Sequence, residues 1–223
     1  MCGFFAFSTG MSAKQIANLF ELTNMPKNEK DIQSIKFYPK SLIPTVSKNS
    51  PNKLVMRYWS LIPRWWKDDP RKIKFSTFNA RVEDIATKPT YRSAWSHHQR
   101  CLIPATWFYE FQTLEDVGKS KTKKIPYKVE IEGEEIVGLA GLYETWTDGQ
   151  HTVESCTMIT RAAIAPLKSI HDRQPIVLRP EQWESWLNPA TTNDEIATLI
   201  QSTVPLIISG VKPETFYTTS EQL

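Results

Sequence analysis

Short apolar stretches alternate with polar turns along most of the chain, and this pattern predicts a sheet-rich fold. Strands are expected at residues 4–8, 53–59, 127–131, 135–143 and 152–160. Asp148 and Gly149 provide the turn that joins the last two of these strands into a hairpin. Burial of the first strand would hold the N-terminus inside the fold, whereas most chain termini are poorly ordered.

The same pattern gives few helices. Residues 101–112 predict a strand, a loop and a second strand, and the polar or lysine-rich segments 24–36 and 119–124 predict connections. Short peripheral helices are expected at residues 12–22, 90–98, 162–169, 180–187 and 193–202, and residues 75–86 are expected to start extended and then turn helical.

Many strands with few helices between them favour an α+β fold with a mixed or mostly antiparallel sheet over a doubly wound parallel sheet. The sequence shows no internal repeat, low-complexity segment or domain boundary, so residues 1–223 are predicted to form a single domain. A chain of 223 residues is long enough to bury a proper core.

Composition narrows the function classes only slightly. A net charge of +3 permits a basic patch but does not demand one, so charge alone does not indicate a nucleic-acid partner. The three cysteines, Cys2, Cys101 and Cys156, lack metal-ligand or redox spacing, and the last two lie in apolar runs that predict core positions. No segment resembles a signal peptide or a membrane span, so a cytoplasmic protein without membrane association is expected.

The first three residues, Met1, Cys2 and Gly3, carry the most distinctive chemistry. If Met1 is removed, Cys2 has a free α-amine beside its thiol, with reference pKa values of about 7.7–8.0 and about 8.5. Such an aminothiol can attack a carboxamide, or it can condense with an aldehyde through a Schiff base and close a thiazolidine ring. The alternative is that Cys2 is an ordinary buried residue, and these three residues alone favour that alternative.

Three further polar residues stand in unusual surroundings. Asn79 follows an apolar strand end, and Glu110 lies in a run whose other members are all aromatic. On a strand, Glu110 shares a face with Phe108, and a carboxylate against aromatic rings has a raised pKa that suits a general acid or base. An exposed Glu110 in water is equally compatible with this run. His171 alone carries little weight, because a lone histidine is usually structural.

Some aromatic and basic residues could contact nucleic acid. Trp65 and Trp66 follow Arg64 in a proline-bounded turn, and exposed tryptophans beside arginine can stack on unpaired bases, although core packing is their more common fate. The candidates for phosphate contacts, each with a surface ion pair as its alternative, are Arg81, Arg92 and Arg173.

Taken together, the segments around these residues resemble the SOS response-associated peptidase (SRAP) family in order and spacing over residues 1 to about 187. The resemblance rests on MCG (1–3), WSLIPRWW (59–66), FNARVED (78–84), YRSAW (91–95), RCLIPATWFYEF (100–111), IPYKV (125–129), AGLYETW (140–146), SCTMITRAA (155–163) and IHDRQPIVL (170–178). It implies a single α+β domain with the N-terminal cysteine in a cleft.

The resemblance also implies a reaction. Members of the family lose the initiator methionine and trap abasic sites in single-stranded DNA, whose ring-opened sugar is an aldehyde. By match, Cys2 would form a thiazolidine cross-link, Asn79 would hold the N-terminal group and the sugar, and Glu110 would shuttle protons. His171 would assist opening of the sugar ring and reversal of the cross-link. The activity would combine thiol-peptidase-like self-removal of Met1 with lyase-like chemistry on DNA.

For DNA binding, the resemblance assigns Arg81 and Arg173 to phosphate contacts and Trp65 and Trp66 to a turn that wedges against bases. The expected partner is single-stranded DNA containing abasic sites, bound by a monomer that uses no cofactor and no metal. One departure concerns DNA directly, because the family usually has arginine after Cys-Gly and this chain has Phe4.

Two other functions compete with this hypothesis. A non-catalytic module of the same fold would bind intact and abasic single strands equally well and would not need Cys2. An N-terminal-nucleophile amidohydrolase also starts with Met-Cys-Gly, but it predicts Arg and Asn-Gly or Gly-Asp substrate motifs that we do not find. It also leaves WSLIPRWW and IHDR unexplained.

Overall fold

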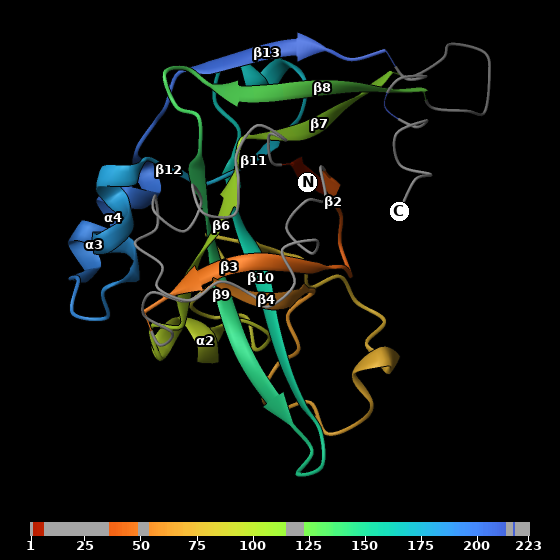
Figure 1. Cartoon of the computed structure of the whole chain (residues 1–223), viewed down its shortest axis with the longest axis vertical. Coiled ribbons are helices and arrows are strands. Elements are labelled where there is room, and N and C mark those ends of the chain that lie inside the picture. The colour runs from red at the N-terminus through yellow and green to blue at the C-terminus, as the bar shows by residue number, and fades with distance from the viewer. Residues whose placement is uncertain (1, 7–35, 49–53, 115–122, 213–215, 217–223) are drawn as a thin grey trace.

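The computed structural model describes residues 2–6, 36–48, 54–114, 123–212 and 216. In these ranges two β-sheets pack against each other, with short helices at the periphery (Figure 1). The α+β class with a mostly antiparallel sheet is therefore confirmed. The helix expected at 12–22 lies outside the described residues.

The smaller sheet has five antiparallel strands in the order β13-β8-β7-β1-β2. Its strands are β1 (Phe4–Ala6), β2 (Lys36–Phe37), β7 (Trp107–Leu114), β8 (Lys123–Ile131) and β13 (Leu206–Gly210). The N-terminal strand is thus placed between two others and is not frayed. Both the backbone N–H and the hydroxyl of Thr106 donate to the carbonyl of Ala6, at 2.9 and 2.8 Å, which ties the end of β1 to the junction before β7.

The larger sheet closes on itself into a small barrel. Its ring consists of β3 (Leu42–Ser47), β4 (Leu54–Trp59), β6 (Arg100–Ala105), β9 (Val137–Thr147) and β10 (Thr152–Ala162). Strand β10 pairs with β9 on one side and with β4 on the other. Five strands in a ring cannot all alternate in direction, so one pair must be parallel, and that pair is β10 with β4. Three short strands extend the sheet: β5 (Asn79–Arg81), β11 (Arg173–Pro175) and β12 (Val177–Leu178).

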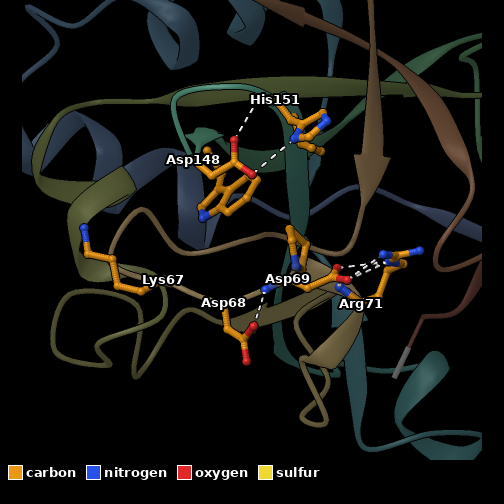
Figure 2. A pocket seen from close by; sticks show the side chains of 9 residues that line it. Lys67, Asp68, Asp69, Arg71, Asp148 and His151 are labelled. Atoms are coloured by element: carbon orange, nitrogen blue, oxygen red, sulfur yellow. Dashed lines mark hydrogen bonds and ion pairs between the residues drawn. The ribbon is translucent and has the colours of Figure 1, made fainter.

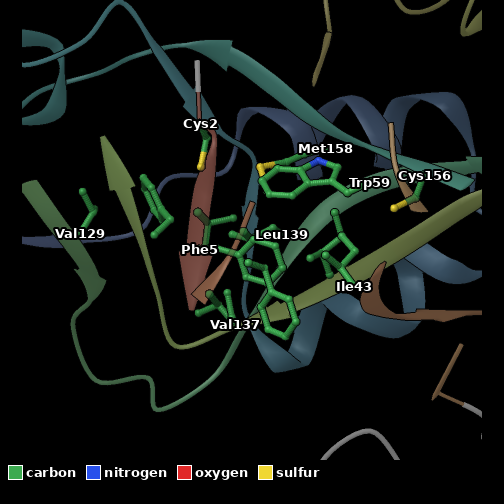
Figure 3. Packing of buried hydrophobic residues seen from close by; sticks show 14 of the residues in the cluster. Cys2, Phe5, Ile43, Trp59, Val129, Val137, Leu139, Cys156 and Met158 are labelled. Carbon is green, nitrogen blue, oxygen red and sulfur yellow. The ribbon is translucent and has the colours of Figure 1, made fainter. Parts of the chain in front are cut away.

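Alternation along the barrel strands separates two apolar cores. On β6, Leu102 belongs to a cluster that includes Trp186, whereas Cys101 and Ile103 belong to a second cluster with Cys2. The second cluster joins residues of the barrel strands, such as Ile43 and Met158, to residues of the five-stranded sheet, such as Phe5 and Val129 (Figure 3). The expected core positions of Cys101 and Cys156 are confirmed, since both are fully buried.

Helices in the described ranges are short: α2 (Arg92–Ser96), α3 (Trp183–Leu187) and α4 (Asn193–Gln201), with 3-10 turns η2 (Pro70–Lys72), η3 (Leu167–Ser169) and η4 (Pro180–Gln182). Helix α4 begins with a capping box in which Thr192 and Glu195 bond to each other's backbone N–H groups. None of the helices in the described residues is long and apolar enough to cross a membrane.

Two helix predictions were wrong. The segment after Asn79 forms strand β5 and then a series of turns, because its backbone pairs in parallel with β10. The helix expected at 162–169 is only the turn η3, since β10 continues to Ala162 to pair with β11. The loop expected within 101–112 is a single residue between β6 and β7, and the lysine-rich connection ends earlier than expected, because Lys123 and Lys124 already lie in β8.

Phe4, the residue that departs from the family pattern, lies on the outer face of the five-stranded sheet. Its ring packs edge to face against Phe111 and Phe216, with centroids 5.6 and 5.3 Å apart. Such pairs contribute about 0.5–1.5 kcal/mol each beyond area burial. Phe4 therefore anchors the strand that carries Cys2 instead of pointing a charge toward DNA.

Candidate active site

Four elements bring the predicted catalytic residues together between the barrel and the five-stranded sheet. Cys2 precedes β1, and Glu110 lies on the adjacent strand β7, where Phe4 pairs with Tyr109. Asn79 opens β5, and His171 lies in the turn before β11. These positions are far apart in sequence, and only the packing of the two sheets makes them neighbours.

Asn79 holds the N-terminal segment directly. Its side-chain Nδ2 donates a 2.7 Å hydrogen bond to the carbonyl oxygen of Cys2. Its Oδ1 is buried and accepts no hydrogen bond from any residue in the described ranges. A buried acceptor without a partner costs free energy, so this amide oxygen can accept a hydrogen bond from a ligand.

Two aromatic residues outside the predicted set fix the strand that carries Asn79. The hydroxyl of Tyr91 donates to the backbone carbonyl of Asn79 at 3.0 Å, and the indole N–H of Trp59 donates to the carbonyl of Phe78 at 2.8 Å. Both side chains are fully buried. The only sequence signal for this role is that Trp59 and Tyr91 open two of the motifs shared with the SRAP family.

Glu110 is a buried carboxyl group with a side-chain exposure of 1%. Burial is the largest cause and raises the pKa of Glu110 from 4.5 to about 8, while nearby positive and negative charges, Asp172 among the negative ones, act in opposite directions and by less. Glu110 therefore lies on the buried face of β7, which it shares with Phe108, and an exposed Glu110 is excluded. A carboxyl group with a pKa near neutral can both give and take a proton.

His171 faces this carboxyl group. Its Nε2 lies 3.9 Å from Oε2 of Glu110. Burial lowers the pKa of His171 below its usual value, so the ring is neutral near pH 7. Nδ1 lies 2.9 Å from the backbone N–H of Arg173, 3.2 Å from its carbonyl oxygen and 3.0 Å from the mostly exposed carboxylate of Asp172, so its neighbours accommodate either tautomer. In the tautomer in which Nδ1 accepts from Arg173, the proton of the neutral ring is on Nε2, toward Glu110.

The thiol of Cys2 is fully buried, among residues such as Trp59 and Met158 (Figure 3). Burial and the nearby charge of Glu110 raise the pKa of the thiol well above its usual value. The thiol is therefore protonated near neutral pH and needs a base when it attacks. Glu110 is the carboxylate whose negative charge raises the pKa of this thiol.

The predicted DNA contacts divide into exposed and occupied side chains. Arg81 and Arg92 are exposed, and neither forms an ion pair within the described ranges. Trp65 is 46% exposed and meets Trp66 edge to face at 5.9 Å, while its indole N–H donates to the carbonyl of Pro89. Arg81, Arg92 and Trp65 therefore remain available for a ligand, whereas Trp66 is half-buried and its indole N–H donates to the carbonyl of Asp69.

Arg173 differs from the exposed candidates because its side chain is already hydrogen-bonded to other residues of the protein. Its guanidinium forms two 2.8 Å hydrogen bonds to the carboxylate of Glu83 and a third to the carbonyl of Thr160. It is 8% exposed. A phosphate would have to compete with Glu83, so in this state Arg173 chiefly joins the turn after β5 to the strand that follows His171.

Within the described residues, no group of three or more His, Cys, Asp or Glu side chains is placed to hold a metal ion. The groups that the site itself offers for chemistry are a thiol, a carboxyl group, an imidazole and an amide.

Comparison with known proteins identifies relatives of this chain. Over residues 1–213 the chain matches the family described as SOS response associated peptidase (SRAP). The abasic site processing protein YoaM of Bacillus subtilis is 34% identical over 197 residues, which span 87% of this chain and 82% of that protein. The abasic site processing protein HMCES of Xenopus tropicalis is 28% identical over 176 residues, 72% of this chain and 51% of that protein.

Solved structures show the same fold at lower sequence identity. A crystal structure of a protein from Bacteroides thetaiotaomicron superposes with a TM-score of 0.81 at 23% identity and covers 96% of this chain and 94% of that one. A protein from Bordetella bronchiseptica gives a TM-score of 0.76 at 21% identity, covering 95% of this chain and all of the other. With a family match along nearly its whole length, the chain belongs to the SOS response associated peptidase (SRAP) family.

Proposed function

We propose that this protein processes abasic sites in single-stranded DNA by linking its N-terminal cysteine covalently to the ring-opened sugar. The observation that carries the proposal is the placement of Glu110, with a pKa of about 8, beside Cys2 and within 3.9 Å of His171. The names of the relatives, abasic site processing proteins, support the same substrate class.

The reaction requires the α-amine of Cys2, so it begins after removal of Met1. The neutral amine adds to the aldehyde carbon of the opened sugar and gives a carbinolamine. Protonated Glu110 donates its proton to the leaving hydroxyl, water departs, and a protonated Schiff base remains. The resulting Glu110 carboxylate then accepts the thiol proton as sulfur bonds to the same carbon. The thiazolidine ring closes, and Glu110 returns to its protonated form.

The other two residues act around this centre. Asn79 holds the carbonyl of Cys2 and offers its unpartnered Oδ1 to the amine or to a sugar hydroxyl. His171, neutral with a proton on Nε2, donates toward the ring oxygen when the sugar hemiacetal opens. The same proton movement in reverse would release the DNA.

Removal of Met1 is the second activity that we propose, and we assign it to the thiol of Cys2 acting on its own chain with Glu110 as the base. Intact mass of the purified protein reports it directly. Wild type is expected to lack Met1, and Glu110→Gln is expected to retain it when expressed in cells without methionine aminopeptidase activity. Complete removal from Glu110→Gln under these conditions would contradict self-processing.

The cross-link itself is tested by denaturing electrophoresis after incubation with a single strand that carries one abasic site. We expect a shifted band with wild type, no stable band with Cys2→Ser, and an undiminished band with the matched control Cys101→Ser. Equal binding of intact and abasic strands with no shifted band would favour a non-catalytic binding module. Glutamine hydrolysis without DNA would favour an amidohydrolase.

A further inference from the structure

A small pocket next to the proposed reaction centre has the composition of a nucleotide-binding site. It has a volume of about 290 Å³, at the small end of the range for ligand pockets. Its walls include three aromatic side chains and three basic ones: Tyr58, Phe75, Phe78, Lys40, Arg71 and Lys74. Of the basic side chains, Arg71 is bound to Asp69, and none of the described residues that line the pocket is acidic. Aromatic faces stack on bases and ammonium groups attract phosphate.

The pocket shares a wall with the reaction centre. Phe78 lines the pocket and immediately precedes Asn79, which binds the carbonyl of Cys2. Tyr58 also lines it and immediately precedes Trp59, which donates to the carbonyl of Phe78 and packs in the same cluster as Cys2. The pocket and the reaction centre are therefore formed by neighbouring residues of the same two segments, 58–59 and 78–79.

Lys40 occupies a backbone position that suits glycine. The turn from Tyr38 to Ser41 has Pro39 at its second position and closes with a hydrogen bond from Ser41 N–H to the carbonyl of Tyr38. Lys40, at the third position, has φ of +70°, where such a turn favours glycine. A lysine in this strained backbone conformation points to a functional role for its side chain. Within the described residues, neither Lys40 nor Lys74 forms an ion pair, so both ammonium groups can meet a phosphate.

A larger cavity nearby provides a contrast (Figure 2). It has a volume of about 530 Å³ and is lined by three carboxylates, Asp68, Asp69 and Asp148, beside basic residues. The carboxylate of Asp69 is bound to Arg71, and that of Asp148 to His151. Because the carboxylates of this cavity pair with its own basic side chains, the cavity is poorly suited to bind a polyanion.

We propose that the pocket around Lys40 and Phe75 is a subsite for the nucleotide next to the abasic site, with the base stacked on Phe75 and the phosphate held by Lys40 and Lys74. The subsite gives the protein a grip on one neighbouring base in addition to the reacting sugar. This inference rests on the proposed function, because it takes abasic single-stranded DNA as the ligand.

Binding can be tested without any covalent step by using a fluorescent single strand that contains tetrahydrofuran, an abasic analogue without an aldehyde. Two further strands each carry a second tetrahydrofuran in place of the 5′ or the 3′ neighbouring base. Wild type is expected to bind one of these strands roughly 5- to 100-fold more weakly than the singly abasic strand, the loss expected for one stacked base. Phe75→Ala should lose this discrimination.

Lys40→Gly separates the binding role from a structural one. Glycine fits the positive φ, so the melting temperature should stay the same or rise. DNA affinity should nevertheless fall several-fold at low salt, and the slope of log Kd against log salt should shrink by about 0.7, one phosphate contact on a single strand. The control Lys124→Ala removes the same charge from β8, outside the pocket, and should leave the neighbour-base discrimination intact.

The inference is overturned if wild type ignores both neighbouring bases, or if Lys40→Gly and Phe75→Ala bind all strands as wild type does. Such a result leaves the proposed function standing as long as wild type still forms a Cys2-dependent link to an aldehyde-bearing strand. Neighbour-base discrimination without any such link would instead refute the proposed function and leave the pocket as a nucleotide site.

Discussion

Two buried clusters in this protein contain cysteine, yet they differ in the ionisable groups that accompany the thiols. The barrel cluster consists of Arg57, Thr45, Ser47, Tyr143, Glu154, Cys101 and Cys156. The site cluster consists of Cys2, Asn79, Glu110 and His171. The cysteines of both clusters are fully buried, so burial alone does not distinguish the clusters.

In the barrel cluster the guanidinium of Arg57 uses all three of its nitrogen atoms. Nε donates to Glu154 at 3.3 Å, Nη1 to Thr45 at 2.6 Å and Nη2 to Ser47 at 3.2 Å. The ring of Tyr143 lies 4.2 Å from its central carbon. A cluster satisfied in this way stabilises the fold and leaves nothing for a ligand to bind.

The site cluster contains a group that can exchange a proton near neutral pH. Glu110 retains its proton up to a pKa of about 8, and Asn79 has a buried oxygen without a hydrogen-bond partner in the described ranges. The imidazole of His171 lies 3.9 Å from the Glu110 carboxyl group. A carboxyl group that titrates near neutral pH, more than burial, distinguishes this cluster from the barrel cluster.

Replacing a carboxylate by an amide in each cluster is the most demanding test of the difference between the two clusters. Glu110→Gln removes the proton shuttle, and the cross-linking rate should fall by about 10²–10⁴-fold in single-turnover assays. Glu154→Gln, the matched change in the barrel cluster, should leave the rate within about twofold and lower stability by about 1 kcal/mol. Equal effects of the two variants on the rate would contradict the assignment.

The barrel cluster should respond mainly in stability. Arg57→Leu removes the hydrogen bonds that the guanidinium donates to the hydroxyl of Ser47 and to Oε2 of Glu154, and we expect a loss of about 2–3 kcal/mol in the free energy of unfolding by urea. At temperatures where the variant is folded, its cross-linking rate should match that of wild type. A folded variant with a rate as low as that of Glu110→Gln would show that the two clusters are coupled.

Glu110 should also give stability a distinctive pH dependence. Because its pKa is about 8 in the folded protein and 4.5 when unfolded, the folded state holds an extra proton between these values. Stability contributed by this group therefore falls as pH rises from 4.5 to about 8, by at most about 5 kcal/mol in total, because the shift spans roughly 3.5 pKa units and each unit is worth about 1.4 kcal/mol. Urea unfolding of wild type and Glu110→Gln across this range measures the difference, and parallel profiles would refute the raised pKa.

The smallest effects are expected on the DNA-binding surface. Arg81→Ala and Arg92→Ala should each weaken binding of the tetrahydrofuran strand a few-fold and lower the salt slope by about 0.7. Arg173→Ala should lower stability as well, because it breaks the ion pair with Glu83. A pure binding defect in Arg173→Ala, with an unchanged melting temperature, would show that Glu83 releases this arginine to DNA.

The sequence predicted the strands well where the signal was local. The strand after Cys2 and the hairpin around Asp148 and Gly149 follow from alternation and turn chemistry, whereas the same pattern left the burial of Glu110 open. The segment after Asn79 was mispredicted because its conformation depends on pairing with β10, about 80 residues away. Strands β3 and β13 were not predicted either, since Pro44 interrupts the first and the second is half-exposed at a sheet edge.

The four candidate catalytic residues were named from motif resemblance, and their proximity could not have come from local pattern. The supports of the site were missed for the same reason. The Glu83 to Arg173 ion pair joins residues 90 positions apart, and Tyr91 reaches the backbone of Asn79 across a turn. A lone arginine in the sequence carries no sign of whether its partner is a phosphate or a carboxylate.

The most direct test of the central claim is the mass of the Cys2 peptide after reaction with an abasic single strand. We predict that proteolysis and nuclease digestion release a peptide that begins at Cys2 and carries the sugar remnant, with the loss of one water. Its thiol should resist alkylation, because both sulfur and nitrogen are bound to one carbon. A remnant on a lysine, or on Cys2 with a thiol that still alkylates, would contradict the account.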